Sequence, residues 1–236
     1  MLATKISFMN EIALICDEFD IDVENVRRGI GSDSRIGPSF IYPGCGYGGS
    51  CFPKDVRAMI HMAQQAGIAD NIFEAVERRN DKQQQVMVDK VLMHFDGDIN
   101  GRKFALWGLA FKPETDDIRG APAIAIAREL SQMGAEVIAF DPQAMGPARE
   151  ALAGFPITFV DDPYDATEGA DALLVTTEWR QFKQPDFRRL SKQLKSSTIF
   201  DGRNIYHPER CVDYGLTYVG IGRSSSLYSA LHSERP

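Results

Sequence analysis

Hydrophobic residues in the first part of the chain recur at the three- and four-residue spacing of helices. Over residues 1–19 they form one apolar stripe, made of Ile6, Met9, Ile12, Ala13, Ile15, Cys16 and Phe19. The same periodicity predicts helices over residues 22–30, 53–65 and 72–95, with glycines just after the first two. A polar turn follows at residues 96–101. We therefore predict a helical domain over residues 1–98.

From residue 99 onward, short apolar runs alternate with amphipathic segments. The runs 103–111, 136–141, 157–160, 172–177 and 198–201 predict strands, and the segments 118–133 and 144–153 predict helices. This alternation indicates a parallel sheet with helices on both faces, so the fold class is α/β. Ligands of such sheets bind beyond the carboxyl ends of the strands. Those ends fall at residues 111–112, 141–142, 176–178 and 201–203.

Composition narrows the classes of function. The chain has 236 residues, a net charge of −7 and four cysteines. The negative charge argues against non-specific nucleic-acid binding, and no apolar run approaches the roughly 20 residues of a membrane span. The start lacks the pattern of a secretory signal, and four cysteines are too few for a disulfide framework. We expect a cytoplasmic protein, and the cysteine and histidine spacings predict no metal site.

The segment richest in chemistry is the loop 44–55, which reads Gly-Cys-Gly-Tyr-Gly-Gly-Ser-Cys-Phe-Pro-Lys-Asp. Glycines let the backbone approach a ligand closely, and Pro53 suits the first turn of a helix. Cys51 would then stand just before a helix N-terminus, where the dipole and the free N–H groups favour a thiolate. We predict a nucleophilic cysteine. The alternative is a cysteine that only packs.

Charged residues near this loop leave two interpretations open. Asp55 could complement the helix dipole or position a water near the cysteine. Lys112 and Arg119 flank an acidic loop between a predicted strand and a predicted helix, where α/β folds bind phosphates. They could equally pair with the acids between them. The loop at residues 112–119 lacks the G-x-G-x-x-G fingerprint, and no Walker-type G-x-x-x-x-G-K occurs in the chain, so the second half need not hold a dinucleotide in the usual way.

Three segments in the same order carry a resemblance to a known family. They are residues 2–11, the glycine loop with Cys51-Phe52-Pro53-Lys54-Asp55, and residues 108–119. Over residues 1–203 the chain resembles the UDP-glucose 6-dehydrogenase family. The resemblance implies two NAD-dependent oxidations that convert UDP-glucose to UDP-glucuronate. It also implies a homodimer formed through the helical domain and a Rossmann-like UDP-sugar-binding domain over residues 99–236.

The resemblance also assigns roles to single residues. Cys51 matches the nucleophile that forms a thiohemiacetal and then a thioester, and Asp55 matches an aspartate that assists the water chemistry. Lys54 and Arg119 match contacts to NAD. Arg35 matches an arginine that crosses to the substrate of the partner subunit. The remaining matches to the UDP-sugar are Phe40, Ile41, Tyr42, Pro43, Gly44, Gly48, Lys112 and Arg203.

The start of the chain departs from the family pattern. The family's NAD fingerprint and its catalytic lysine and asparagine would lie upstream of Leu2, and the predicted first helix has no capping residue. We therefore expect a C-terminal portion of a longer enzyme. Three hypotheses remain at this point: a UDP-glucose 6-dehydrogenase, an inactive fragment that binds UDP-sugar and dimerises, or a dehydrogenase for UDP-N-acetylhexosamine or GDP-mannose.

Overall fold

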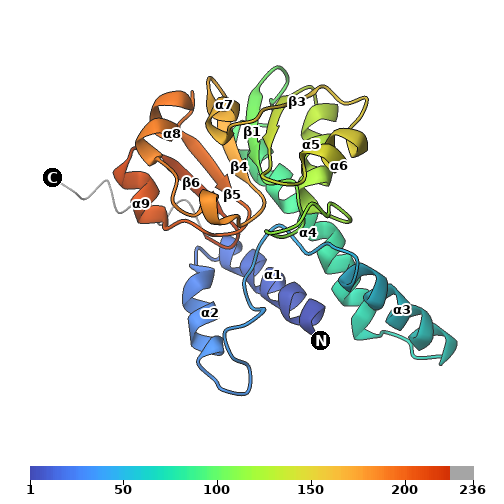
Figure 1. Cartoon of the computed structure of the whole chain (residues 1–236). Coiled ribbons are helices and arrows are strands. Elements are labelled where there is room, and N and C mark those ends of the chain that lie inside the picture. The colour runs from blue at the N-terminus through green and yellow to red at the C-terminus, as the bar shows by residue number, and fades with distance from the viewer. Residues whose placement is uncertain (224–236) are drawn as a thin grey trace.

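A six-stranded parallel sheet forms one part of the molecule, and a helical part packs below it (Figure 1). The computed structural model describes residues 1–223. The strand order is β3-β2-β1-β4-β5-β6. The strands are β1 (Lys103–Trp107), β2 (Glu136–Phe140), β3 (Ile157–Phe159), β4 (Ala172–Val175), β5 (Thr198–Asp201) and β6 (Thr217–Gly220). This confirms the predicted α/β class with a parallel sheet.

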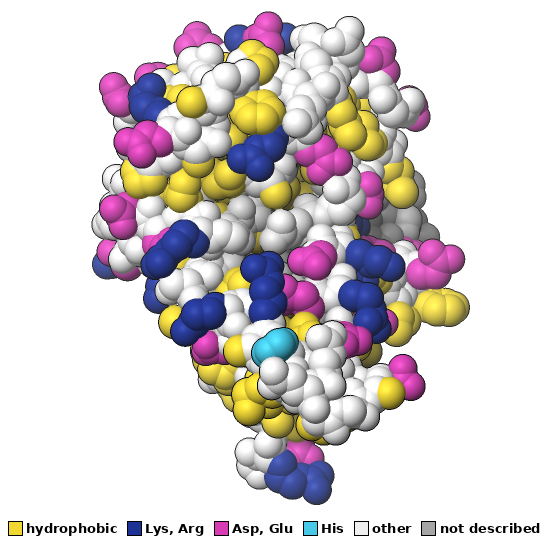
Figure 2. Space-filling model, turned by 90° about the vertical axis from the view of Figure 1, so that its right-hand side faces the viewer, with side chains coloured by type: hydrophobic (Ala, Val, Ile, Leu, Met, Phe, Trp, Pro, Cys, Tyr) yellow, Lys and Arg dark blue, Asp and Glu magenta, His cyan; other side chains and the backbone are white. Residues whose placement is uncertain are grey.

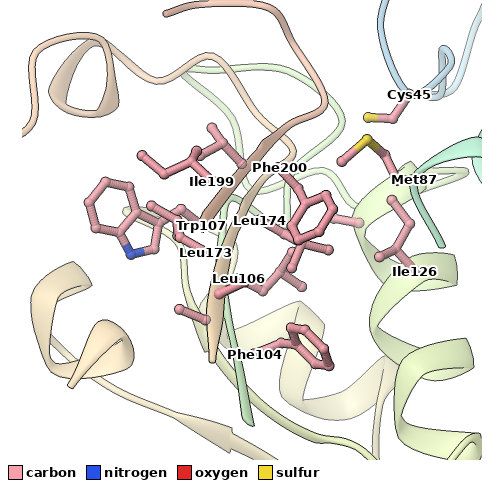
Figure 3. Packing of buried hydrophobic residues seen from close by; sticks show 14 of the residues in the cluster. Cys45, Met87, Phe104, Leu106, Trp107, Ile126, Leu173, Leu174, Ile199 and Phe200 are labelled. Carbon is pink, nitrogen blue, oxygen red and sulfur yellow. The ribbon is translucent and has the colours of Figure 1, made fainter. Parts of the chain in front are cut away.

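Helices cover both faces of the sheet. One face carries α5 (Pro122–Gln132) and α6 (Met145–Ala151), and the other carries α7 (Pro163–Thr167), α8 (Phe187–Gln193) and α9 (Pro208–Asp213) (Figure 1). A short 3-10 helix, η1 (Arg180–Phe182), follows β4. Alternate residues of a strand point to opposite faces. Trp107 therefore packs against Tyr164 and Phe182, while Phe104 points the other way, toward the side of α5 (Figure 3).

The helical part consists of α1 (Leu2–Glu18), α2 (Val23–Gly31), α3 (Phe52–Gln65) and α4 (Ile72–His94). Side-chain caps set two of the starts, because Asp22 accepts from the Glu24 N–H and Asn71 accepts from the Glu74 N–H. The antiparallel pair α3–α4 projects from the molecule (Figure 1). One buried apolar cluster joins α1, α4 and the sheet. The division into domains at residues 1–98 and 99–236 stays a prediction.

Some predicted boundaries are wrong. The strand predicted over residues 103–111 ends at Trp107, and the helix predicted over 118–133 begins at Pro122. The backbone N–H groups of Leu109 and Ala110 donate to the buried Asp141 carboxylate, at 2.7 and 3.1 Å, instead of to a neighbouring strand. Pro122 supplies no N–H, which makes it a natural first residue of a helix. The residues between β1 and α5 therefore form a loop at the carboxyl edge of the sheet.

The end of β6 returns to the helical part and forms a clasp, which we define as Gly222 and Arg223 against α1 and α2. The Gly222 carbonyl accepts from the Val23 N–H at 2.8 Å. A side chain at position 222 would lie 2.7 Å from the Ala13 Cβ, and its φ of +67° is one that glycine adopts freely. Arg223 lies near Asp22 and Glu24, at 3.6 and 3.8 Å. The clasp joins opposite ends of the described chain.

Within residues 1–223, none of the helices is both long and apolar enough to cross a membrane.

Candidate active-site cleft around Cys51

The thiol of Cys51 is exposed at the start of α3. Cys51 is the N-cap residue of this helix, and a proline follows within the first helical turn. Its Sγ lies 3.7 Å from the Ser50 hydroxyl. The thiol opens into a cleft of about 970 Å³, and the side chain therefore has an open path to a ligand. The sequence-predicted residues that line this cleft are Phe40, Tyr42, Pro43, Gly44, Gly48, Cys51, Lys112 and Arg203.

The opposite wall of the cleft comes from the carboxyl edge of the sheet. Lys112 follows β1, Glu178 follows β4 and Arg203 follows β5, as the positions of the strand ends predicted. Lys112 lies 5.3 Å from the centroid of the Phe111 ring. Two chain segments that lie far apart in the sequence therefore meet across the cleft, with the thiol on one side and cations on the other.

Arg203 is held by backbone carbonyl groups. Its guanidinium donates to the carbonyl oxygens of Thr176 at 2.8 Å, Gly46 at 3.1 Å and Phe111 at 3.4 Å. It also lies 3.4 Å from the Glu178 carboxylate. Arg203 thus ties the cysteine loop to the loops after β1 and β4, and much of its hydrogen-bonding capacity is used inside the protein.

Glycines in the cysteine loop allow a close approach to the loop after β1. A Cβ at Gly48 would lie 2.2 Å from the Gly120 carbonyl oxygen, and one at Gly49 would lie 2.7 Å from the Phe111 ring. The Gly49 N–H donates to the Arg119 carbonyl oxygen at 2.6 Å. The absence of side chains here is therefore what brings the cysteine loop and the sheet together.

Three predicted residues line neither this cleft nor the second hollow described below. The Ile41 side chain is buried in the main core, and its assigned contact with the UDP-sugar stays a prediction. Asp55 is 65% exposed and pairs with Lys54 at 3.2 Å. Arg35 is 87% exposed and pairs with Asp33 at 2.5 Å, outside the cleft. The assigned roles of Asp55 in water chemistry and of Arg35 toward a partner subunit stay predictions.

A second hollow of about 460 Å³ adjoins the cysteine loop. Lys54 and Arg119 both line it, together with Gly49 and Gly120, so the structure brings the two predicted NAD contacts to one place. Arg119 also pairs with Asp117 at 2.8 Å, as the alternative interpretation proposed. Its guanidinium holds the pKa of Asp117 below the usual value through hydrogen bonds. Two cations beside glycine backbone are a fitting environment for the phosphates of a dinucleotide.

Side chains of one charge sign do not form a continuous patch on the face made by helices α3 to α6. Figure 2 shows that basic and acidic side chains are interleaved across the middle of this face. Within residues 1–223, no group of three or more histidine, cysteine or acidic side chains is placed to hold a metal ion.

The other cysteines are buried and pack in the protein. Cys16, Cys45 and Cys211 are at most 1% exposed. Cys45 lies in the loop beside Met87 of α4 (Figure 3), and burial raises the pKa of its thiol. It therefore fills space beside the cleft-lining loop.

Two buried aspartates shape the carboxyl edge of the sheet. The Asp141 carboxylate accepts from the backbone N–H groups of Gln143 and Ala144 as well as from the loop after β1, so it organises turns. Asp201 accepts from the Arg203 and Tyr206 N–H groups and from the Tyr218 hydroxyl. Burial raises the pKa of Asp201 to about 6. This second carboxylate fixes the loop that carries Arg203.

Sequence reasoning missed several residues of the cleft. Glu178, Lys183 and Asn204 line it, and of these only Glu178 could be placed at a strand end in advance. It also missed three buried amides, Asn10, Asn80 and Gln83, that contact the cysteine loop. Their signal in the sequence is weak: polar residues at positions where a helix otherwise turns its apolar side inward.

Comparison with known proteins assigns the chain to a family. The central domain of the UDP-glucose/GDP-mannose dehydrogenase family matches residues 1–82, and the UDP binding domain of the same family matches residues 105–208. The chain belongs to the UDP-glucose/GDP-mannose dehydrogenase family.

Individual relatives agree with this assignment. The UDP-glucose 6-dehydrogenase of Pseudomonas aeruginosa is 52% identical over 226 residues, which cover 94% of this chain and 50% of the relative. A UDP-glucose dehydrogenase from Pyrobaculum islandicum superposes with a TM-score of 0.81 at 33% identity, over 94% of this chain and 48% of that one. An NDP-N-acetyl-D-galactosaminuronic acid dehydrogenase from Methanosarcina mazei gives 0.81 at 26% identity, over 96% and 49%. The chain spans about half the length of the relatives it matches.

Proposed function

We propose that this chain supplies the substrate-binding and thiol-bearing portions of a UDP-glucose 6-dehydrogenase that uses NAD. The observation that carries the proposal is the exposed Cys51 thiol at the N-terminus of α3, in a cleft whose other wall presents Lys112. The family membership and the 52% identity to an enzyme of that name support it. Identity to the UDP-glucose dehydrogenase of Pyrobaculum islandicum, at 33%, is higher than to the NDP-N-acetyl-D-galactosaminuronic acid dehydrogenase, at 26%, which favours glucose over the alternative sugars.

In this proposal Lys112 faces the diphosphate, and Cys51 faces C6 of the sugar. After the C6 alcohol has become an aldehyde, the Cys51 Sγ bonds to C6 and the former carbonyl oxygen takes a proton, which gives a thiohemiacetal. The second oxidation leaves a thioester, and water then breaks the S–C bond to release the carboxylate and restore the thiol. NAD, when bound, accepts one hydride at each oxidation. Lys54 and Arg119 would hold its phosphates beside Gly49 and Gly120.

We further propose a homodimer formed through the helical domain. Three large apolar side chains stand exposed on α1, namely Leu2, Phe8 and Ile15, and a fourth is its C-cap residue Phe19. Phe8 and Ile15 are seven residues apart, so they fall on one helix face and could pack against a second copy. The proposal includes a cytoplasmic location, which the four free thiols support.

The substrate can be tested by calorimetric titration of the 236-residue chain with UDP-glucose, UDP-N-acetylglucosamine and GDP-mannose. We expect the tightest binding for UDP-glucose. NADH formation would be followed with the chain alone and with the remaining half of the Pseudomonas aeruginosa relative added. Turnover only in the mixture would support a portion of a longer enzyme. Tighter binding of GDP-mannose would refute the proposed substrate.

Lys112→Ala tests the cation on the sheet side of the cleft. Loss of a charge-assisted contact should weaken UDP-glucose binding by about 1.5–3 kcal/mol, on the order of ten- to hundredfold in Kd. The matched control is Lys192→Ala, because Lys192 is exposed on α8 and lies outside the cleft. Equal affinities for the two variants would show that Lys112 is only a surface residue.

A further inference from the structure

The backbone of residues 44–47 has no strand or helix partner, yet most of its polar groups are hydrogen-bonded. The Gly44 N–H donates to Asn10 Oδ1 at 2.9 Å, and Gln83 Nε2 donates to the Gly44 carbonyl oxygen at 2.7 Å. The Tyr47 N–H donates to Asn80 Oδ1 at 2.9 Å, and Asn80 Nδ2 donates back to the Tyr47 carbonyl oxygen at 3.1 Å. Asn80 therefore pairs with Tyr47 as a neighbouring strand would.

None of the three amide side chains lines the cleft, although Ile6 of α1 does, and Asn80 lines the second hollow. Asn10 lies on α1, and Asn80 and Gln83 lie three residues apart on α4. They are 1%, 4% and 0% exposed. A buried amide is costly unless it is hydrogen-bonded. The three side chains form hydrogen bonds with four backbone groups of the loop. The loop therefore supplies partners that the helices do not.

Two further atoms show that helix packing alone does not explain these residues. Among residues 1–223, Asn10 Nδ2 and Gln83 Oε1 are buried without a hydrogen-bond partner. Apolar residues at these positions of α1 and α4 could be buried at less cost. The hydrogen bonds to the loop therefore offset the cost of burying these polar groups in α1 and α4.

Other bonds fix the same segment from the side of the sheet. The Cys45 N–H donates to the Gly202 carbonyl oxygen at 2.8 Å, and Arg203 donates to the Gly46 carbonyl oxygen. Gly44, Gly46 and Tyr47 line the cleft that holds the Cys51 thiol. The position of this wall is thus determined jointly by both parts of the molecule.

We propose that Asn10, Asn80 and Gln83 are positioning residues that hold the cleft-lining segment 44–47 and, through it, the loop that carries Cys51. They act through the backbone of the loop and do not touch the substrate. The consequence for substrate binding rests on the proposed function, whereas the consequence for the loop does not.

Hydrogen exchange measured by mass spectrometry tests the proposal on the 236-residue chain. Asn80→Leu removes both bonds to Tyr47, and Gln83→Met removes the bond to Gly44 while keeping the side-chain length. Each should speed exchange in peptides covering residues 40–51 by about tenfold or more, with strands β1 and β4 unchanged. Asn80→Asp keeps the acceptor for the Tyr47 N–H and should fall between. If Asn80→Leu fails to fold, Gln83→Met decides the question.

The matched control is Gln85→Met, which removes an amide from α4 that bonds Glu129 and not the loop. It should leave exchange in the loop unchanged. Unchanged loop exchange in Gln83→Met, or an acceleration shared equally by β1 and β4, would overturn the proposal. UDP-glucose should bind the two loop variants about tenfold more weakly. Faster loop exchange in a chain that binds no UDP-glucose at all would support the positioning role and count against the proposed function.

Discussion

Among the cysteines, all of which lie in the described chain, Cys51 alone is exposed to solvent. Its exposure follows from its place at the N-terminus of α3, where a flexible approach through glycines ends and a proline begins the helix. The other three thiols are packed in the protein interior. One thiol is therefore available for chemistry, whereas the other three contribute to packing.

Selective alkylation checks this difference. Iodoacetamide should add one carbamidomethyl group to the native chain at Cys51, because the reagent cannot reach the buried thiols without local unfolding. Cys51→Ser should remove the fast modification and retain UDP-glucose binding, since the two side chains have similar size. Rapid labelling of Cys16, Cys45 or Cys211 in the native protein, detected by peptide mass spectrometry, would contradict the prediction.

Asp201 predicts a particular pH dependence of stability. Its pKa rises from 3.8 to about 6 on folding, so the folded state holds the proton more tightly. The stabilisation is fully present below about pH 4 and is lost as the pH rises through 6. In Asp201→Asn this loss is absent, so the variant should gain up to about 3 kcal/mol relative to the wild type between pH 4 and pH 7.

Urea unfolding at a series of pH values measures this difference. A constant offset between the two proteins is expected from the altered hydrogen bonds to Tyr206 and Tyr218, so the slope of the difference is the informative quantity. A difference that stays flat from pH 4 to pH 7 would show that Asp201 ionises normally in the folded protein.

At the scale of elements, the cysteine loop and the loop after β1 fit together through glycines. Gly48 and Gly120 approach so closely that neither loop can move toward the other by the width of a methyl group. Long loops are often mobile, but here side chains from α1, α4 and the turn after β5 bond the backbone. The cleft wall is therefore built from irregular chain that is held like a regular element.

Gly48→Ala tests this fit. The new methyl group would meet the backbone of Gly120 and Ala121, so it should destabilise the protein by about 1–3 kcal/mol and weaken UDP-glucose binding. Gly146→Ala is the matched control, because nothing lies within 4 Å of a Cβ there. The control should stay within about 0.5 kcal/mol of the wild type. Equal melting temperatures for both variants, measured by calorimetry, would mean that the loop shifts to accommodate the methyl group at little cost in stability.

Elements with long periodic patterns could be predicted, and short ones could not. Helices α1 to α4 lie within two residues of their predicted bounds, since they span at least two turns and carry caps or a proline at three of their starts. Strand β6 and helices α7, α8 and α9 were missed, because four to seven residues show too little periodicity.

The site divides in a similar way. Cys51 and its glycines could be predicted because their chemistry is local in the sequence. Asn80 could not, because its value comes from a contact with Tyr47 that lies 33 residues away in the sequence. The same holds for Arg203, whose three carbonyl partners belong to three separate loops.

At the scale of the whole molecule, α1 presents apolar side chains to solvent while its other side enters the main core. Phe8 and Phe19 are 55% and 69% exposed. Monomeric proteins seldom leave such a stripe uncovered. This exposed stripe bears on assembly and not on the chemistry of the cleft.

Phe8→Ser combined with Phe19→Ser should convert the proposed dimer to monomers, because it removes apolar area from the contact. Sedimentation velocity over a range of concentrations measures the change. Met133→Ser serves as the control, since Met133 is also an exposed apolar residue but lies at the end of α5. A wild-type chain that sediments as a monomer at every concentration would refute the dimer.

The clasp of Gly222 and Arg223 bears on how the protein can be dissected. The family's UDP binding domain match stops at residue 208, before β6. A polypeptide trimmed there would expose the edge of β5, and one trimmed after Gly220 would keep every strand yet lose the bond between Gly222 and Val23. The family match therefore ends before the residues that complete the sheet and bond it to α2.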